Sequence, residues 1–512
     1  MPQAPLSANR RHFFVSTTAC AAYLLGCTPQ PAEQSVKPAV RRDVPLRIVL
    51  CGNDRWAAAL KTAWSAVAEQ PLRVQVLDAD LIDAARWQGQ VVAAMSDCDV
   101  AIVPAGLLAA LDHTANLMPP NREWFDEQSR DVPALYPSLR EGLMKYAGRT
   151  VAVPLGAVQP VLVMRNDTAG TDIEPPGDWE QFLAVAKRLP PAAVAEPLAA
   201  GAAAKMFLWR ANAARPPVWL FDRESLSPVI ATEPYVEVLE TMKRCVSIYG
   251  DQRLTPGEVW SRIAAGSLQM ALAWPAVHSQ VERIEEPVSC SFAAMPAERG
   301  ADELPASTLF DYESPVAVIS SHCRQSEAAK RFLAWVIDGE GISMTRSAVT
   351  GLSAVRGGEE AGHGATAGHG AAAGHGATAD NGAAAGHGAE EDDGVAANAR
   401  ELPDDGEMLN DGAAKTRLTR DDAASTADTT AASYAAQASR ALTSLSLRPP
   451  LQLLEYRQYA AALDAAVLAC LNGEQSARSA LQQAAKAWTD ITQQVGTQSQ
   501  QQAWRRAQGM NG

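Results

Sequence analysis

The sequence lacks the local signatures of the common catalytic sites. No G-x-G-x-x-G follows its first predicted strand, and it contains no phosphate-binding P-loop, no G-x-S-x-G nucleophile turn and no H-E-x-x-H zinc motif. Histidine is scarce in the predicted folded body, where only His113, His278 and His322 occur. We therefore expect neither an enzyme nor a cofactor. A secreted hydrolase that uses a pair of the 58 acidic residues stays open as an alternative.

Basic residues and paired cysteines are also in short supply. The 44 lysines and arginines are outnumbered by 58 acidic residues, which gives a net charge of −14. Binding to nucleic acid needs a basic face, so this charge argues against such a partner. Scattered cysteines without a C-x-x-C pair are more often buried thiols than a disulfide framework, although one or two bridges stay open. Those that follow the first 27 residues are Cys51, Cys98, Cys245, Cys290, Cys323 and Cys470.

Apolar runs long enough to cross a membrane are missing, but the first 27 residues form an export signal. Arg10-Arg11 precedes an uncharged apolar run that ends in Leu24-Leu25-Gly26-Cys27. A basic segment, a short apolar core and small residues at a cleavage point predict a secretory signal peptide. The paired arginines resemble the twin-arginine export signal, and the last four residues resemble a bacterial lipobox, which implies that Cys27 is lipidated. A signal of the general secretory route with a chance cysteine is the alternative.

This N-terminus predicts an exported lipoprotein that is anchored to a membrane of the cell envelope or periplasm. Residues 28–45 contain proline, glutamine and lysine without periodicity, which is typical of a flexible tether. The rest of the 512-residue chain has room for about two or three domains.

Strands and helices alternate in the body of the chain. Short apolar runs at residues 46–51, 72–77 and 99–104 have the length of strands. A helical pattern lies between the first two runs, and a helix start follows the third. This alternation predicts a parallel sheet in an α/β fold. Asp178 is placed to cap a later helix. Further strands are expected at 268–274 and 315–320, and further helices after residue 256 and at 327–337, 451–470 and 479–495.

Residues 357–430 differ in character from the rest of the body. G-H-G-A-T-A units repeat with a period of six, so His363, His369 and His375 are evenly spaced and His387 resumes the phase. A tract of glycine and alanine has no large apolar side chains with which to build a core, so we predict a disordered insertion. The four histidines could bind transition-metal ions loosely, at a cost in chain entropy, and we assign no metal site to them.

Five further segments occur in the order that is usual in one family. The first reads G-R-T-V-A-V-P-L-G at residues 148–156, and the others cover residues 161–167, 175–182, 266–275 and 318–335. Together they resemble the extracellular solute-binding proteins of ABC importers, and above all the sugar-binding group. The second segment departs from the family pattern, because Met164-Arg165-Asn166 stands where the family usually has a tyrosine before the asparagine.

The resemblance implies a bilobal α/β protein of the periplasmic-binding-protein type II fold, with two lobes joined by crossover hinge strands. We expect lobe one at 46–118 plus 276–314 and lobe two at 119–275 plus 315–505, with the insertion inside lobe two. The crossings fall near 118–120, 274–275 and 313–315. Members of the family close their lobes around a solute. They deliver it to a membrane permease, and we expect this protein to be a monomer.

Ligands of open α/β sheets bind beyond the carboxyl ends of the strands, and aromatic faces suit the apolar side of a sugar ring. Asp54 and Arg55 could equally cap or pair locally at a helix start, whereas Trp179, Trp335 and Trp488 are expected in the core. The candidate ligand residues are Asn53, Asp54, Arg55, Trp56, Trp209, Trp219, Trp274, Asp311 and Tyr312, with Glu313 beside them.

The favoured hypothesis is a lipid-anchored protein that binds a small solute, with a carbohydrate expected, and passes it to an ABC permease. One alternative is a bilobal sensor that feeds a signalling partner. Another is a metal-buffering envelope lipoprotein that uses the histidine repeat. The identity of the solute stays open, because related bilobal proteins carry polyamines, iron complexes, phosphate esters and oligopeptides.

Overall fold

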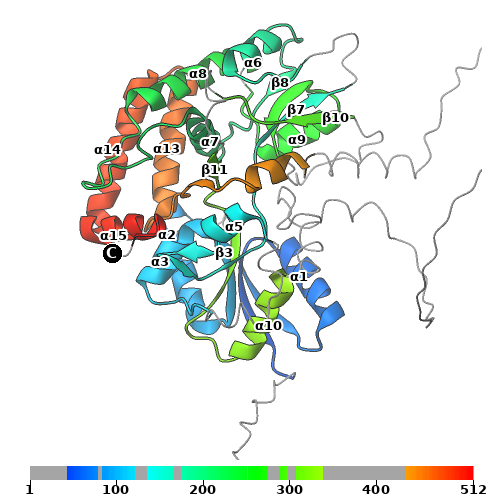
Figure 1. The fold of residues 1–512 in the computed structure, drawn as a ribbon, viewed down its shortest axis with the longest axis vertical. Coiled ribbons are helices and arrows are strands. Elements are labelled where there is room, and N and C mark those ends of the chain that lie inside the picture. The colour runs from blue at the N-terminus through cyan, green and yellow to red at the C-terminus, as the bar shows by residue number, and fades with distance from the viewer. Residues whose placement is uncertain are drawn as a thin grey trace, which may run out of the picture. The chain divides into compact units, whose positions relative to one another are not determined.

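Two β-sheets organise the part of the chain that the structure describes (Figure 1). The computed structural model describes residues 43–78, 83–120, 135–166, 174–250, 252–274, 289–297, 307–337, 434 and 436–510. These residues belong to one compact unit, which runs from Arg42 to Gly512. The predicted signal peptide with Cys27, residues 28–42 of the predicted tether, and the predicted insertion at 357–430 lie outside the described residues.

The first sheet contains, in spatial order, β2 (Leu72–Leu77), β1 (Leu46–Cys51), β3 (Val100–Pro104), β12 (Pro315–Ile319) and β6 (Val153–Pro154). β1 runs parallel to β2 and β3, whereas β12 is antiparallel to β3 and β6. Every residue of β3 and β12 is buried, as expected for strands in the middle of a sheet. The predicted strands at 46–51 and 72–77 are confirmed, but the sheet is mixed instead of wholly parallel.

Helices pack with this sheet to form the first lobe. Asn53 begins the first of them, because its side chain accepts a hydrogen bond from the Trp56 N–H group at 2.9 Å. Trp64 and Trp335 pack with their ring centroids 5.1 Å apart, so two of these helices share an aromatic core. The helical elements are α1 (Asp54–Val67), α2 (Ala84–Ala94), η2 (Met95–Asp97), η3 (Ala105–Leu107), α3 (Leu108–His113), α5 (Pro137–Gly142) and α10 (Ser326–Ile337), and a hairpin of β4 (Lys145–Tyr146) and β5 (Arg149–Thr150) accompanies them.

The second sheet has the order β10 (Cys290–Ala293), β7 (Val161–Arg165), β9 (Met270–Ala273) and β8 (Val194–Ala195). Its helices begin at caps. The predicted cap Asp178 accepts a hydrogen bond from the Gln181 N–H group at 2.8 Å, and Thr255 forms a capping box with Glu258. The sheet and its helices form the second lobe, with α6 (Trp179–Ala186), α7 (Ala203–Ala214), α8 (Glu233–Tyr249) and α9 (Pro256–Ala264).

The C-terminal helices contact both lobes. α13 (Tyr456–Leu471) and α14 (Ala477–Val495) pack on α7 and α8 of the second lobe. α15 (Thr497–Ala507) packs on α3 of the first lobe, and its Ala503 carbonyl accepts a hydrogen bond from the Tyr146 hydroxyl at 3.1 Å. Gly496 joins α14 to α15 with a φ of 105°, a conformation that favours glycine. Helices were predicted from the sequence at 451–470 and 479–495, in agreement with α13 and α14, whereas α15 was not predicted.

Strand pairing corrects the predicted division of the chain between the lobes. β6 lies in the first sheet, so the chain first crosses at residues 155–160, between β6 and β7, and not near 118–120. β10 pairs with β7 in the second sheet, so the prediction of a crossing at 274–275 is also wrong. β12 pairs with β3, which places it and α10 in the first lobe. A crossing does lie at 313–315, directly before β12, but there the chain enters the first lobe, whereas the prediction had it leave that lobe.

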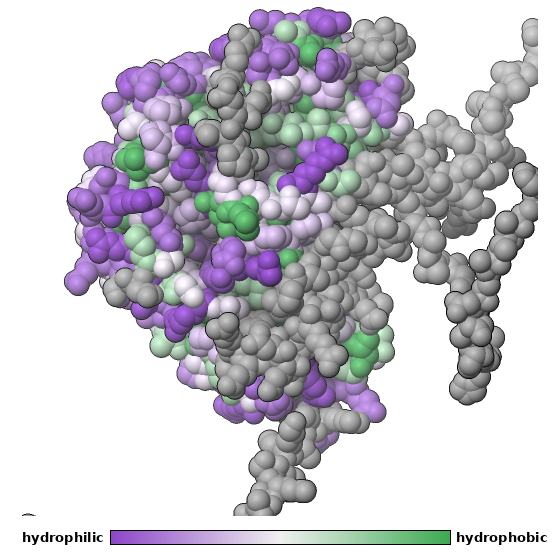
Figure 2. All heavy atoms as spheres, in the orientation of Figure 1, coloured by the Kyte–Doolittle hydropathy of each residue, from purple (hydrophilic) through white to green (hydrophobic). Residues whose placement is uncertain are grey.

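The described residues contain neither a helix suited to spanning a membrane nor a disulfide. Cys98, Cys245 and Cys470 are buried thiols, and burial raises the pKa of Cys98 to about 12 and that of Cys470 to about 11. Apolar areas on the face drawn in Figure 2 are small and separated by hydrophilic residues. The large hydrophobic side chains exposed on the described surface are Val67, Val218, Leu445 and Met510.

Gly106 allows a close approach between the first lobe and α13. A Cβ atom added to Gly106 would lie 2.6 Å from Cδ2 of the buried Tyr456, closer than Cβ atoms normally come. We expect Gly106→Ala to lower the free energy of unfolding by about 1–3 kcal/mol through overpacking. Gly89→Ala is the matched control, because nothing lies within 4 Å of its Cβ position in α2. Urea unfolding measures both variants, and equal stabilities would contradict the expectation.

Candidate functional site

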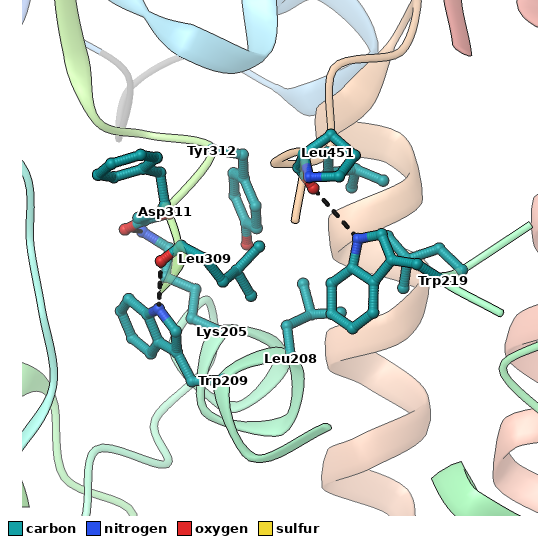
Figure 3. A pocket seen from close by; sticks show the side chains of 11 residues that line it. Lys205, Leu208, Trp209, Trp219, Leu309, Asp311, Tyr312 and Leu451 are labelled. Atoms are coloured by element: carbon teal, nitrogen blue, oxygen red, sulfur yellow. Dashed lines mark hydrogen bonds and ion pairs between the residues drawn. The ribbon is translucent and has the colours of Figure 1, made fainter. Parts of the chain in front are cut away.

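A pocket with aromatic and aliphatic walls lies between α7 and the segments that follow two short paired strands (Figure 3). These strands, β11 (Ser307–Leu309) and β13 (Ser446–Arg448), run parallel to each other. Four candidate ligand residues line the pocket, namely Trp209, Trp219, Asp311 and Tyr312. We use the name aromatic pocket for these four together with Lys205, Leu208, Leu220, Leu309, Phe310, Pro449 and Leu451.

Backbone carbonyl groups fix both indole rings of the aromatic pocket. Trp209 donates from Nε1 to the Leu309 carbonyl at 3.3 Å, and Trp219 donates from Nε1 to the Pro449 carbonyl at 3.1 Å. Figure 3 shows these two hydrogen bonds on opposite sides of the pocket. Since the ring N–H groups are engaged, the indoles offer apolar ring surface. Arg448 also lies over the Trp219 ring, 5.2 Å from its centroid.

A buried ion pair supplies the polar side of the aromatic pocket. Lys205 Nζ lies 2.8 Å from Asp311 Oδ2 and 5.2 Å from the centroid of the Tyr312 ring. Burial by itself would lower the pKa of Lys205, but the charges of Asp311 and Glu313 outweigh this effect and the pKa is raised. The ammonium group therefore stays protonated at neutral pH. The pair has no net charge, and an ammonium group has three donors with which to serve Asp311 and a ligand.

Glu313, Tyr456 and Arg457 extend the polar groups toward the first lobe. Arg457 Nη2 lies 2.9 Å from Glu313 Oε2, and the Tyr456 hydroxyl donates to Glu313 Oε1 at 3.0 Å. The guanidinium group of Arg457 lies 4.2 Å from the ring centroid of Trp87 on α2. We call these four residues the bridging network. The side chains of Arg457 and Glu313 remain 17% and 24% exposed, so a ligand can reach them.

The bridging network stands at the carboxyl end of β3. The backbone N–H groups of Ala105 and Gly106 donate to the carbonyl groups of Ser314 and Tyr312 at 2.9 and 2.8 Å, which holds the crossing segment against the strand end. The rings of Tyr312 and Tyr456 lie 5.8 Å apart and join the network to the aromatic pocket. This position satisfies the rule that ligands of open α/β sheets bind beyond the carboxyl ends of the strands.

The aromatic pocket is nearly filled by its own side chains. Its free volume is about 10 Å³, which is close to the least space that holds one water molecule. A solute of several carbon atoms therefore needs the walls to separate. The walls come from α7 and from the segments after β11 and β13, so movement of α7 against these segments would open the pocket.

The loop after β1 has a local structural role. Asn53 caps α1, Asp54 and Arg55 are exposed in its first turn, and Trp56 is buried beside Gly52. None of these four candidates lines the aromatic pocket. Trp274 packs edge-on against Trp209 with ring centroids 5.0 Å apart, also without lining the pocket. A role in ligand binding for these five residues stays a prediction.

Sequence reasoning missed Trp87, Lys205, Tyr456 and Arg457. All four lie on helices, where a lone charged or aromatic residue carries no local signal of a site. Only the contacts with Asp311 and Glu313, more than a hundred positions away in sequence from Lys205 and Arg457, reveal their arrangement. The expectation that Trp179, Trp335 and Trp488 belong to the core is confirmed, because each is at most 9% exposed.

Residues 82–362, more than half of the 512 residues, match the model of the bacterial extracellular solute-binding proteins. The chain belongs to this family. Its members are binding proteins, which confirms the predictions of a solute-binding family and of a protein that is not an enzyme. The family is extracellular, so this solute-binding protein is exported.

Solved structures confirm the predicted bilobal fold of this solute-binding protein. An ABC transporter solute-binding protein from Agrobacterium radiobacter K84 in complex with ribitol matches with a TM-score of 0.57 and 16% identity, over 88% of this chain and 98% of its own. Maltose-bound T. maritima MalE3 matches with a TM-score of 0.56 and 15% identity, over 88% and 100%. The cyclic alpha-maltosyl-1,6-maltose binding protein from Arthrobacter globiformis matches with 0.53 and 13%, over 88% and 100%. No curated protein matches the sequence.

Proposed function

We propose that this solute-binding protein captures a neutral carbohydrate or polyol and delivers it to the permease of an ABC importer, while acyl chains on Cys27 anchor it to the membrane. The observation that carries the proposal is the aromatic pocket, in which fixed indole rings meet a charge-balanced Lys205–Asp311 pair. The solutes named for the similar structures, which are ribitol, maltose and a cyclic maltosyl-maltose, are of the same chemical class.

The chemistry of the site favours an uncharged, hydroxyl-rich solute. The C–H faces of a sugar are apolar and can cover the rings of Trp209 and Trp219, whereas its hydroxyl groups both donate and accept hydrogen bonds. Lys205 and Asp311 supply a donor and an acceptor side by side. A charged solute would have to compete with an ion pair that is already satisfied, and burying its charge unpaired would be costly.

Closure of the lobes would complete the binding cycle. The crossing at 155–160 connects the two sheets, and the crossing at 313–315 carries Glu313 directly beside the site. A hinge movement that separates α7 from Tyr312 would admit the solute, and its reversal would enclose it. The permease would then recognise the closed form. Both lobes take part, because the bridging network connects α13 with Trp87 of the first lobe.

Calorimetry with a panel of ligands tests the proposed solute class. We expect ribitol, maltose or another neutral carbohydrate to raise the melting temperature, because a ligand at 100 times its Kd adds about 2.7 kcal/mol of stability. Amino acids and inorganic phosphate serve as charged controls. No response to any carbohydrate, together with a Zn²⁺ response that disappears on deletion of residues 357–392, would contradict the proposal and favour metal buffering.

A further inference from the structure

A second cavity lies between the first lobe and the C-terminal helices. We call it the Glu455 groove, and its lining residues are Gln88, Ala110, His113, Thr114, Leu454, Glu455, Gln458, Gln494 and Val495. Its volume is about 370 Å³, and it shares no lining residue with the aromatic pocket. Cavities of roughly 300–1,000 Å³ hold small organic ligands, so the groove has room for one without rearrangement.

Both lobes contribute walls to the Glu455 groove. Gln88 lies on α2 and His113 on α3, both in the first lobe. Gln458 lies on α13 and Gln494 on α14, which pack on α7 and α8 of the second lobe. A molecule bound in the groove would therefore contact both lobes, and its affinity would depend on how they are arranged.

Glu455 has an unusual backbone conformation at the start of α13. Its φ is 58°, in the left-handed region that residues with a side chain seldom adopt. The Glu455 N–H group donates to Gln88 Oε1 at 2.7 Å, so a side chain of the first lobe secures this conformation. Oε2 of Glu455 accepts from Gln458 Nε2 at 3.2 Å, while Oε1 has no hydrogen bond within the described residues. Strain of this kind is often retained where it serves binding.

Charge decides which class of ligand suits the groove. Glu455 is the one carboxylate among the lining residues, and no described lysine or arginine lines the groove. Three glutamine side chains and Thr114 add uncharged hydrogen-bonding groups. Burial raises the pKa of Glu455, because it disfavours the charged form, and a bound cation would offset that effect. His113 is the one basic side chain of this lining, and an anion would find no lysine or arginine among these residues.

We propose that the Glu455 groove binds a small protonated amine, whose ammonium group pairs with the Glu455 carboxylate and whose other polar groups contact the glutamine amides. Glu455 directly precedes Tyr456 and Arg457 in the bridging network, so the amine would hold the start of α13 against α2. This site is separate from the proposed carbohydrate site and does not depend on it. Any effect of the amine on solute affinity must be matched by an equal effect of the solute on amine affinity.

Isothermal titration of the full-length chain in mild detergent with putrescine tests the amine site. Butane-1,4-diol has the same carbon chain without the charges, and we expect putrescine to bind and the diol not to bind. Glu455→Gln keeps the size of the side chain and removes its charge. We expect it to weaken putrescine binding roughly tenfold to hundredfold, since the ammonium group then meets a neutral amide instead of a carboxylate and the ion pair is lost.

Two further variants make the test specific. Glu237→Gln removes the same charge from an exposed position on α8 and should leave the putrescine affinity unchanged. Gln494→Ala, at an exposed position of the groove, should weaken binding roughly fivefold and serves if Glu455→Gln does not fold. Equal putrescine affinities in all variants, or a loss caused by Trp219→Leu instead, would overturn the proposal. The same variants are also titrated with maltose. If maltose does not bind, the proposed carbohydrate site is contradicted, but the putrescine result still tests the amine site.

Discussion

Replacing Glu196 with glutamine is expected to lower the free energy of unfolding by about 3–5 kcal/mol, because it leaves the charge of Arg210 buried without a partner. Both side chains are at most 1% exposed, and Arg210 Nη2 lies 2.7 Å from Glu196 Oε2. The guanidinium group also lies 3.7 Å from the ring centroid of Trp179. Its Nη1 donates to Cys245 Sγ at 3.8 Å, so the chain surrounds this cation on several sides.

An exposed ion pair of the same lobe provides the matched control. Glu180 and Arg244 lie 2.8 Å apart, with side chains 58% and 50% exposed. Glu180→Gln should cost no more than about 1 kcal/mol, because water replaces the lost partner. Urea unfolding of both variants measures the contrast, and equal losses would show that Arg210 does not depend on Glu196. The double variant Glu196→Leu with Arg210→Met should recover most of the stability, since it removes both buried charges.

Trp219→Leu is expected to weaken carbohydrate binding roughly tenfold to hundredfold, because it removes an aromatic face from the proposed site. Trp219 lines the aromatic pocket, is 8% exposed, and is oriented by its hydrogen bond to the Pro449 carbonyl. Leucine keeps the position apolar but cannot cover the face of a sugar ring. Calorimetric titration with the solute found in the panel measures the effect.

Trp335→Leu controls for the loss of stability that accompanies any change of a buried tryptophan. Trp335 is 9% exposed and packs against Trp64 and Phe332 in the first lobe, away from the aromatic pocket. Both variants should lose stability through the cavity that the smaller side chain leaves. Only Trp219→Leu should lose affinity. Comparable losses of affinity in both would mean that the ligand does not contact Trp219.

Local structure was the most predictable part of this protein. The first two strands, the helix capped by Asp178 and the helix near 327–337 follow from apolar periodicity and capping residues, which act over a few positions. α15 was missed because its sequence is mostly glutamine and other polar residues, with Ala503 and Trp504 as its main apolar contacts. A helix of this composition is stable chiefly through what it packs on.

The division into lobes was less predictable. β10 and β12 are both short strands, and the sequence of neither strand indicates which sheet it joins. Their partners are β7 and β3, which lie far away in the chain. Pairing between distant strands depends on burial of both faces and on the fit of neighbouring elements. The two misplaced crossings follow from this. Pro315 at the start of β12 marked the position of the third crossing, but the lobes on its two sides were predicted the wrong way round.

The sequence by itself indicated the α/β pattern and the family resemblance, and it predicted an export signal. It also pointed to four residues that line the aromatic pocket, namely Trp209, Trp219, Asp311 and Tyr312. Only the tertiary structure brought Lys205 to Asp311 and Arg457 to Glu313, across 106 and 144 positions of the chain. It also showed that Asn53 caps a helix and that Trp56 packs beside Gly52. The physical reason is range, because caps and periodicity act between near neighbours, whereas a binding site is assembled by packing between segments that the sequence keeps far apart.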